Sequence, residues 1–208
     1  MAVFRFWLLR ILTGLLIFQS ACQSNVETIE NRDEYGRLER FQRRKKDFAK
    51  EGLYQRFHPD GYLIEEAQYS NDSLDGARKF FFPNGAVESV QHYRRGVIHG
   101  KYQKFYESGQ LEIEQDYTNG VLEGLSKAWY KNGVHKEQVT LRGNEENGPF
   151  IEWYENGNLK AEGSYLDGDN EDGVLKLYDT LGQLERTLEC QRGVCHTTWA
   201  RPGLKDEQ

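Results

Sequence analysis

The chain has 208 residues, which is enough for one domain or two small ones. Its 13% of aromatic residues excludes a disordered polar chain. The 21 glycines, the aromatic residues and a hydrophobic fraction of only 38% together favour thin, turn-rich β structure over a thick α/β core. The formal net charge of −6 argues against general nucleic-acid binding.

Residues 1–21 have the organisation of a secretory signal peptide. Arg5 and Arg10 precede an apolar run over 11–18. This run is shorter than the roughly 20 apolar residues that a membrane-spanning helix needs. We therefore expect the protein to be exported.

The end of this segment resembles the lipobox of bacterial lipoproteins, in which a cysteine carries the lipid. Ser20, Ala21 and Cys22 match that pattern, whereas Gln19 stands where an aliphatic residue is usual. The resemblance implies lipidation at Cys22 and attachment in the cell envelope, at the outer membrane. The alternative is an ordinary signal peptide with an incidental cysteine.

The next segments are expected to lead into the main domain. Residues 22–35 are predicted to be a lipid-anchored, flexible tether, and residues 36–51 a half repeat that caps the domain. Four consecutive basic residues occupy 43–46. They are interpreted as a solvated part of the linker or cap, with contact to anionic lipid headgroups as the alternative.

Residues 52–195 contain an internal repeat with a period of 24 residues and one insertion. Its first glycines are Gly52, Gly76, Gly100, Gly124, Gly148 and Gly173. A second glycine follows nine residues after each of them, often as Asn-Gly or Asp-Gly. An aromatic residue stands five residues after each first glycine, and a tyrosine usually ends the unit. Each unit is therefore predicted to be a β-hairpin.

The turn chemistry fixes the expected register of these hairpins. Pro83 cannot donate a ladder hydrogen bond, so residues 83–85 are predicted to form a three-residue loop that ends in a left-handed glycine. Phe81 then lies opposite Val87. Alternation along the second strand places Tyr93 on the same face, which we expect to be the core.

These units resemble the MORN-repeat-variant proteins, and residues 148–168 are the closest copy of the pattern. The resemblance covers about residues 52–193. It implies an all-β, elongated antiparallel meander of about six stacked hairpins whose ends need caps. Members of the family include proteins labelled antitoxin-like.

Cys190 and Cys195 replace two positions that should touch in the other repeats. Because the chain is expected to be exported, we predict a disulfide between them that fixes the last hairpin. Two reduced thiols are the alternative. Residues 196–208 are expected to be a polar tail.

A row of rings is the candidate binding site. The residue after each recurrent aromatic points to the opposite face of the predicted sheet, and four of these residues are Phe82, Tyr106, Tyr130 and Tyr154. Such a row could stack on sugar rings or hold an extended peptide. The alternative is that this face is also packed.

No catalytic, cofactor or metal site is expected. The acidic turn over 167–172 lacks the spacing of a calcium loop, because Asp172 stands where that loop needs glycine. The sequence therefore favours a non-catalytic envelope lipoprotein whose repeats bind or scaffold another macromolecule, with a protein as the expected partner. The alternatives are an immunity protein that neutralises a toxin in the envelope, and a binder of cell-wall glycan or of a membrane surface.

Overall fold

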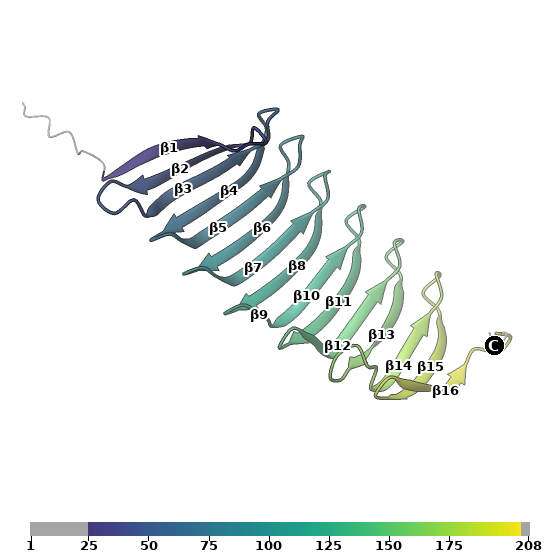
Figure 1. The fold of residues 1–208 in the computed structure, drawn as a ribbon. Coiled ribbons are helices and arrows are strands. Elements are labelled where there is room, and N and C mark those ends of the chain that lie inside the picture. Colours follow the sequence, from purple (N-terminus) through teal and green to yellow (C-terminus); the bar gives the residue numbers. More distant parts are fainter. Residues whose placement is uncertain (1–24, 205–208) are drawn as a thin grey trace, which may run out of the picture.

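The computed structural model describes residues 25–204, and these residues form one 16-stranded antiparallel sheet without helices (Figure 1). The predicted all-β fold is thereby confirmed. No helix in residues 25–204 has the length and apolar character needed to cross a membrane.

The strands follow one another across the sheet in chain order. The first eight are β1 (Val26–Arg32), β2 (Leu38–Arg44), β3 (Lys50–Phe57), β4 (Leu63–Ser70), β5 (Ser73–Phe81), β6 (Val87–Arg94), β7 (Val97–Phe105) and β8 (Leu111–Thr118). The others are β9 (Val121–Leu122), β10 (Gly124–Trp129), β11 (His135–Arg142), β12 (Glu145–Trp153), β13 (Leu159–Tyr165), β14 (Gly173–Tyr178), β15 (Leu184–Gln191) and β16 (Val194–Ala200). Only the short β9 lies off this path, where it pairs with β8.

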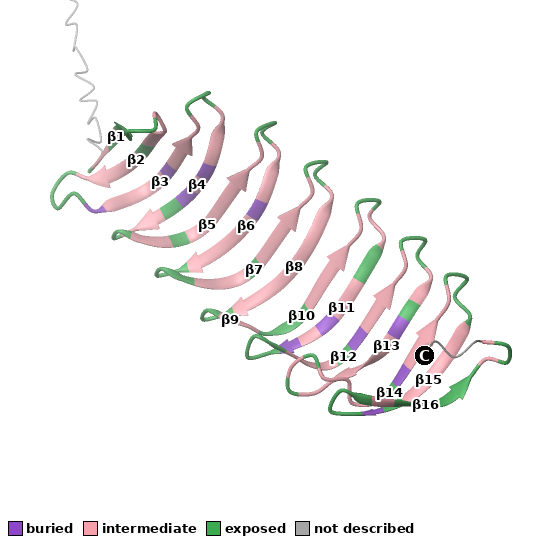
Figure 2. Ribbon diagram, turned by 45° about the vertical axis from the view of Figure 1, so that its right-hand side comes forward, coloured by how far each residue is buried: buried purple, intermediate pink, exposed green. Residues whose placement is uncertain are grey.

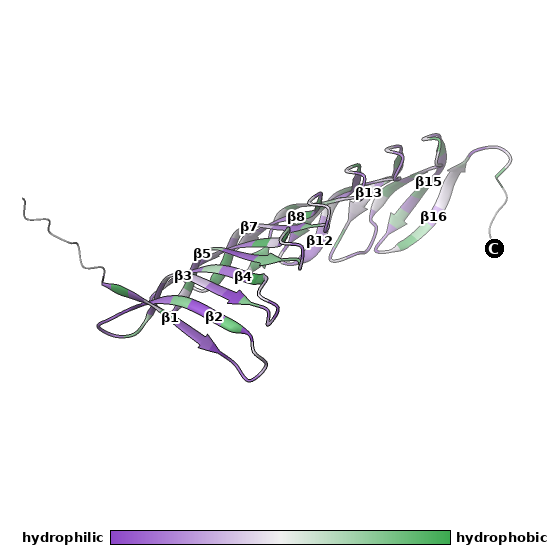
Figure 3. Ribbon diagram, turned by 90° about the horizontal axis from the view of Figure 1, so that it is seen from above, coloured by the Kyte–Doolittle hydropathy of each residue, from purple (hydrophilic) through white to green (hydrophobic). Residues whose placement is uncertain are grey.

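The six predicted hairpins are β3–β4, β5–β6, β7–β8, β10–β11, β12–β13 and β14–β15. They stack side by side into an elongated ribbon of bent strands (Figure 1). Seen from above, the ribbon twists along its length and carries hydrophobic segments throughout, with no second layer over residues 25–204 (Figure 3).

Both ends of the array extend further than the sequence indicates. Residues 26–32 are part of the predicted tether, but they form β1 and pair along their whole length with β2. Ile29 lies opposite Phe41 there, so the register pairs two apolar residues across the strands. At the other end β16 continues to Ala200, past the predicted boundary at 195. Edge strands satisfy the backbone of the last repeats, which is what capping requires.

The turns at one edge of the ribbon are the predicted three-residue loops. The N–H of Phe82 donates to the carbonyl of Ala86 at 2.9 Å, and the N–H of Gly85 donates to the carbonyl of Phe82 at 2.9 Å. Gly85 has a φ of 84°, which is the left-handed conformation expected of it. Phe81 lies opposite Val87 as predicted.

The predicted position of the recurrent tyrosines is wrong, because each hairpin contains a bulge. Phe105 pairs with Leu111, but the preceding residue of β7 pairs with Ile113, which leaves Glu112 as an extra residue. An extra residue shifts the alternation of side chains by one. Tyr117 therefore points to the face opposite Phe105.

The core lies on the face that carries the tyrosines, which we call the core face; the other is the outer face. Buried hydrophobic residues are Ala49, Tyr54, Ala67, Val139, Leu141, Phe150, Ala161, Leu175 and Cys190. Apart from Ala49 in a loop, the strand register places all of them on the core face. Those on strands lie on β3 and β4 and again on β11 to β15, where Figure 2 shows short buried stretches. Because no second layer covers them, neighbouring side chains provide the cover, as where the rings of Phe150 and Tyr165 stack at 4.2 Å.

Candidate binding groove

The predicted binding residues form a regular row along the ribbon, which we call the aromatic row: Phe82, Tyr106, Tyr130 and Tyr154. Each residue immediately precedes the three-residue loop of its hairpin. They lie on the opposite face from the preceding aromatic, as predicted, but this is the core face. Successive rings are two strands apart, so their spacing along the ribbon is about 9.6 Å.

The tyrosine hydroxyls of this row hydrogen-bond each hairpin to the next. The hydroxyl of Tyr106 donates to the carbonyl of Trp129 at 2.9 Å. The hydroxyl of Tyr130 donates to the carbonyl of Trp153 at 2.8 Å, and that of Tyr154 to the carbonyl of Tyr178 at 2.8 Å. The hydroxyls therefore have a packing role, and they hold the rings in fixed orientations.

Two hollows open beside the rings of the aromatic row. The first has a volume of about 400 Å³ and lies between Phe82 and Tyr106. The second, of about 320 Å³, is lined by Tyr154 together with the core residues Phe150 and Leu175. We call the aromatic row and these two hollows the aromatic groove.

Each hollow also holds a lysine–glutamate pair. Lys104 Nζ lies 3.0 Å from Glu112 in the first hollow, and Lys160 Nζ lies 2.6 Å from Glu152 in the second. The hydrogen bond to its glutamate raises the pKa of each lysine, so both ammonium groups are charged at neutral pH. These pairs were not predicted from the sequence, although both use the same two positions of the repeat with the charges exchanged.

Carboxylates outnumber ammonium groups in both hollows. Glu88, Glu107 and Glu112 line the first with Lys104 and Lys131. Glu152, Glu171 and Glu185 line the second with Lys160. The groove is therefore net acidic and favours a ligand with positive charge.

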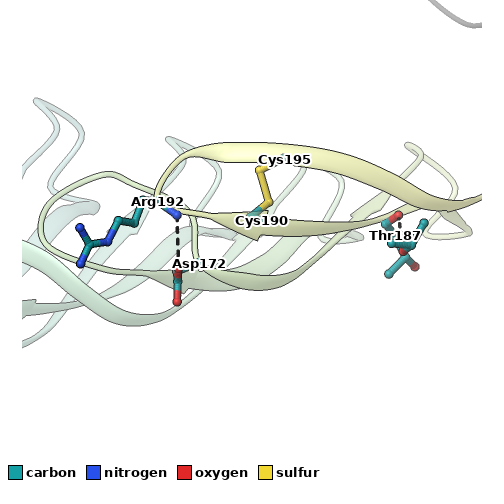
Figure 4. The surroundings of a disulfide bond; sticks show 6 residues. Asp172, Thr187, Cys190, Arg192 and Cys195 are labelled. Carbon is teal, nitrogen blue, oxygen red and sulfur yellow. Dashed lines mark hydrogen bonds between the residues drawn. A yellow bond between two sulfur atoms is a disulfide. The ribbon is translucent and has the colours of Figure 1, made fainter.

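A disulfide joins Cys190 and Cys195, with the two sulfur atoms 2.02 Å apart (Figure 4). The two residues lie opposite each other on β15 and β16. In the turn between these strands, the N–H of Arg192 donates to the carboxylate of Asp172 at 3.2 Å. The disulfide thus connects the final edge strand to the core, since Cys190 is buried.

Two further positions were considered from the sequence, the acidic turn and Cys22. Among residues 25–204 no three His, Cys, Asp or Glu side chains gather as a metal site, and this includes the acidic turn over 167–172. Cys22 and the segment before it lie outside the described residues.

Comparison with known families identifies the repeat. The sequence profile described as MORN repeat variant matches residues 50–71, 74–95, 98–119, 122–142 and 146–167, which is more than half of the chain. Each matched segment covers one of the hairpins described above. A search of curated proteins finds no match to the chain. On the repeat profile and the stacked hairpins together, the chain belongs to the MORN repeat variant family.

Proposed function

We propose that this protein is a non-catalytic binding module whose aromatic groove holds a segment of another protein. The observation that carries the proposal is the pair of open hollows beside rings whose orientation is already fixed. Aromatic rings that are ordered before binding lose little conformational entropy on contact, which makes them effective binding residues. The core face has no second layer over residues 25–204, so the groove is open to a partner.

Site-specific photo-crosslinking in cells tests this function. A photoreactive residue replaces Ser108, which lines the first hollow, and in a control it replaces Lys127, which lies on the outer face. We expect a covalent adduct with another protein from position 108 and none from position 127. Equal crosslinking from both positions, or none from either, would contradict the proposal. A toxin in the adduct would identify the immunity alternative.

We also propose that the module is attached to the cell envelope through a lipid on Cys22. The support is the signal-peptide organisation of residues 1–21 and the cysteine that follows it. Fractionation of cells that express the chain and the Cys22→Ser variant tests the anchor. We expect the unchanged chain in the membrane fraction and the variant released from it. An unchanged chain in the soluble cytosol would contradict both export and anchoring.

A further inference from the structure

The spacing of the aromatic row restricts the conformation of its ligand; this inference rests on the proposed function of the same groove. The four rings recur once per hairpin, about 9.6 Å apart, along a line that crosses the strands. A peptide that runs along this line and contacts every ring must present a side chain on one face at that interval.

Of the regular peptide conformations, polyproline II fits this interval best. It has three residues per turn and rises about 3.1 Å per residue, so every third side chain returns to the same face after about 9.3 Å. In an extended β-strand, side chains on the same face are about 6.7 Å or 13 Å apart, and neither interval matches the spacing of the rings. In an α-helix, a side chain returns to the same face after seven residues, or about 10.5 Å. The difference from the ring spacing then grows to nearly 3 Å over the three intervals between the four rings.

The electrostatics of the groove add a second requirement. Glutamates outnumber lysines in both hollows, which favours a cationic ligand. One ring already has a cationic neighbour, since Lys131 Nζ lies 5.8 Å from the centroid of the Tyr106 ring. The ring faces of the row are therefore suited to both proline rings and cationic side chains.

We propose that the aromatic groove binds a proline-rich, basic segment of another protein in the polyproline II conformation. A proline at every third position contacts the rings of the aromatic row, and arginine or lysine side chains between the prolines face the carboxylates of the hollows. Such a segment already favours this conformation when it is free, so both the peptide and the fixed rings lose little conformational entropy on binding.

Peptide binding to the full chain tests the ligand class. The probe is a synthetic peptide of four Pro-Pro-Arg repeats, and its control is a peptide of four Gly-Ser-Arg repeats with the same length and charge. We expect calorimetry to show at least tenfold tighter binding of the proline peptide, because the flexible control must be ordered on binding. Equal affinities would overturn the inference, and so would binding of a soluble cell-wall oligosaccharide but of neither peptide.

Two neighbouring residues provide a matched pair of variants. Tyr106→Leu removes a ring from the groove, whereas Phe105→Leu removes a ring from the outer face. We expect Tyr106→Leu to weaken binding of the proline peptide by about 3- to 10-fold and Phe105→Leu to leave it unchanged. Equal losses would overturn the inference. If Tyr106→Leu does not fold, Glu88→Lys tests the same hollow through its charge, and unchanged affinity in that variant counts against the inference.

The outcomes separate this inference from the proposed function. A protein adduct at position 108 without binding of the proline peptide would leave the function standing and overturn the ligand class. Binding of the proline peptide without any adduct in cells would support the ligand class and contradict the function.

Discussion

Replacing Gly163 by alanine should destabilise the protein. Gly163 lies on β13 directly opposite Phe150 on β12. Among the glycines of residues 25–204 it stands apart, because its φ lies outside the left-handed region that the others occupy. Alanine should therefore suit the backbone. The added Cβ, however, would lie 2.8 Å from Cε1 of Phe150 and 3.2 Å from Cδ1 of Leu175.

Two opposing contributions determine how much Gly163→Ala changes the free energy of unfolding. Overpacking a core costs about 1–3 kcal/mol, and Gly→Ala at a compatible backbone conformation returns about 0.4–1 kcal/mol. Phe150 cannot move away freely, because it is 4% exposed and its ring stacks on Tyr165 at 4.2 Å. We expect a net loss of about 1–2 kcal/mol in the free energy of unfolding.

Denaturant unfolding of three variants measures this loss and its cause. Gly163→Ala, Phe150→Leu and the double variant form a double-mutant cycle with the unchanged protein. We expect Gly163→Ala to cost about 1 kcal/mol less in the Phe150→Leu background than in the unchanged protein, because the smaller leucine side chain leaves room for the methyl group. A Gly163→Ala variant that is more stable than the unchanged protein would refute the reasoning, as would strictly additive effects.

Four further predictions concern charge, backbone strain and the disulfide. Burial raises the pKa of Glu137, so Glu137→Gln should raise the free energy of unfolding at neutral pH, with the gain shrinking as the pH falls through that raised pKa and absent below the ordinary value of 4.5. Hydrogen bonds lower the pKa of Glu162, so Glu162→Gln should reduce stability at neutral pH, and this loss should shrink below 4.5. Arg95 has a φ of 50° in a two-residue turn, and Arg95→Asn should stabilise by about 0.5–1 kcal/mol in thermal unfolding. Reducing the disulfide between Cys190 and Cys195 should cost about 2 kcal/mol, with faster amide hydrogen exchange confined to the last strands.

Each of these expectations has an outcome that contradicts it. Glu137 and Glu162 serve as controls for each other, and shifts of the same sign at neutral pH would contradict the electrostatic account. Asn119 already has a φ of 50° in the equivalent turn, so asparagine suits this backbone conformation. Destabilisation by Arg95→Asn would therefore show that a contact of the arginine side chain stabilises the fold. Faster exchange throughout the ribbon after reduction would show that the last repeats control the whole array.

The local features of the hairpins could be predicted from the sequence because they depend on a few neighbouring residues. The period of the glycines located the units, and Pro83 with Gly85 determined the loop type and the Phe81–Val87 pair. The aromatic row was found in the same way, and it lies opposite the preceding aromatic residues as predicted. The core was assigned to the wrong face, because the bulge opposite Phe105 depends on pairing between two strands and leaves no distinct residue signal.

The repeat and the turns can be derived from the amino-acid sequence, since both depend on glycine conformations and on residues close together in the chain, whereas the meander of stacked hairpins was implied by the family resemblance. The folded sheet was needed to establish which face is the core, that the tyrosine hydroxyls donate to carbonyls of the next hairpin, and that β1 and β16 extend the sheet at its two ends. These features escape a local reading because one extra residue in a strand reverses every side chain beyond it. Burial on an uncovered sheet is therefore set by the register between strands and by contacts between hairpins, rather than by the composition of any single strand.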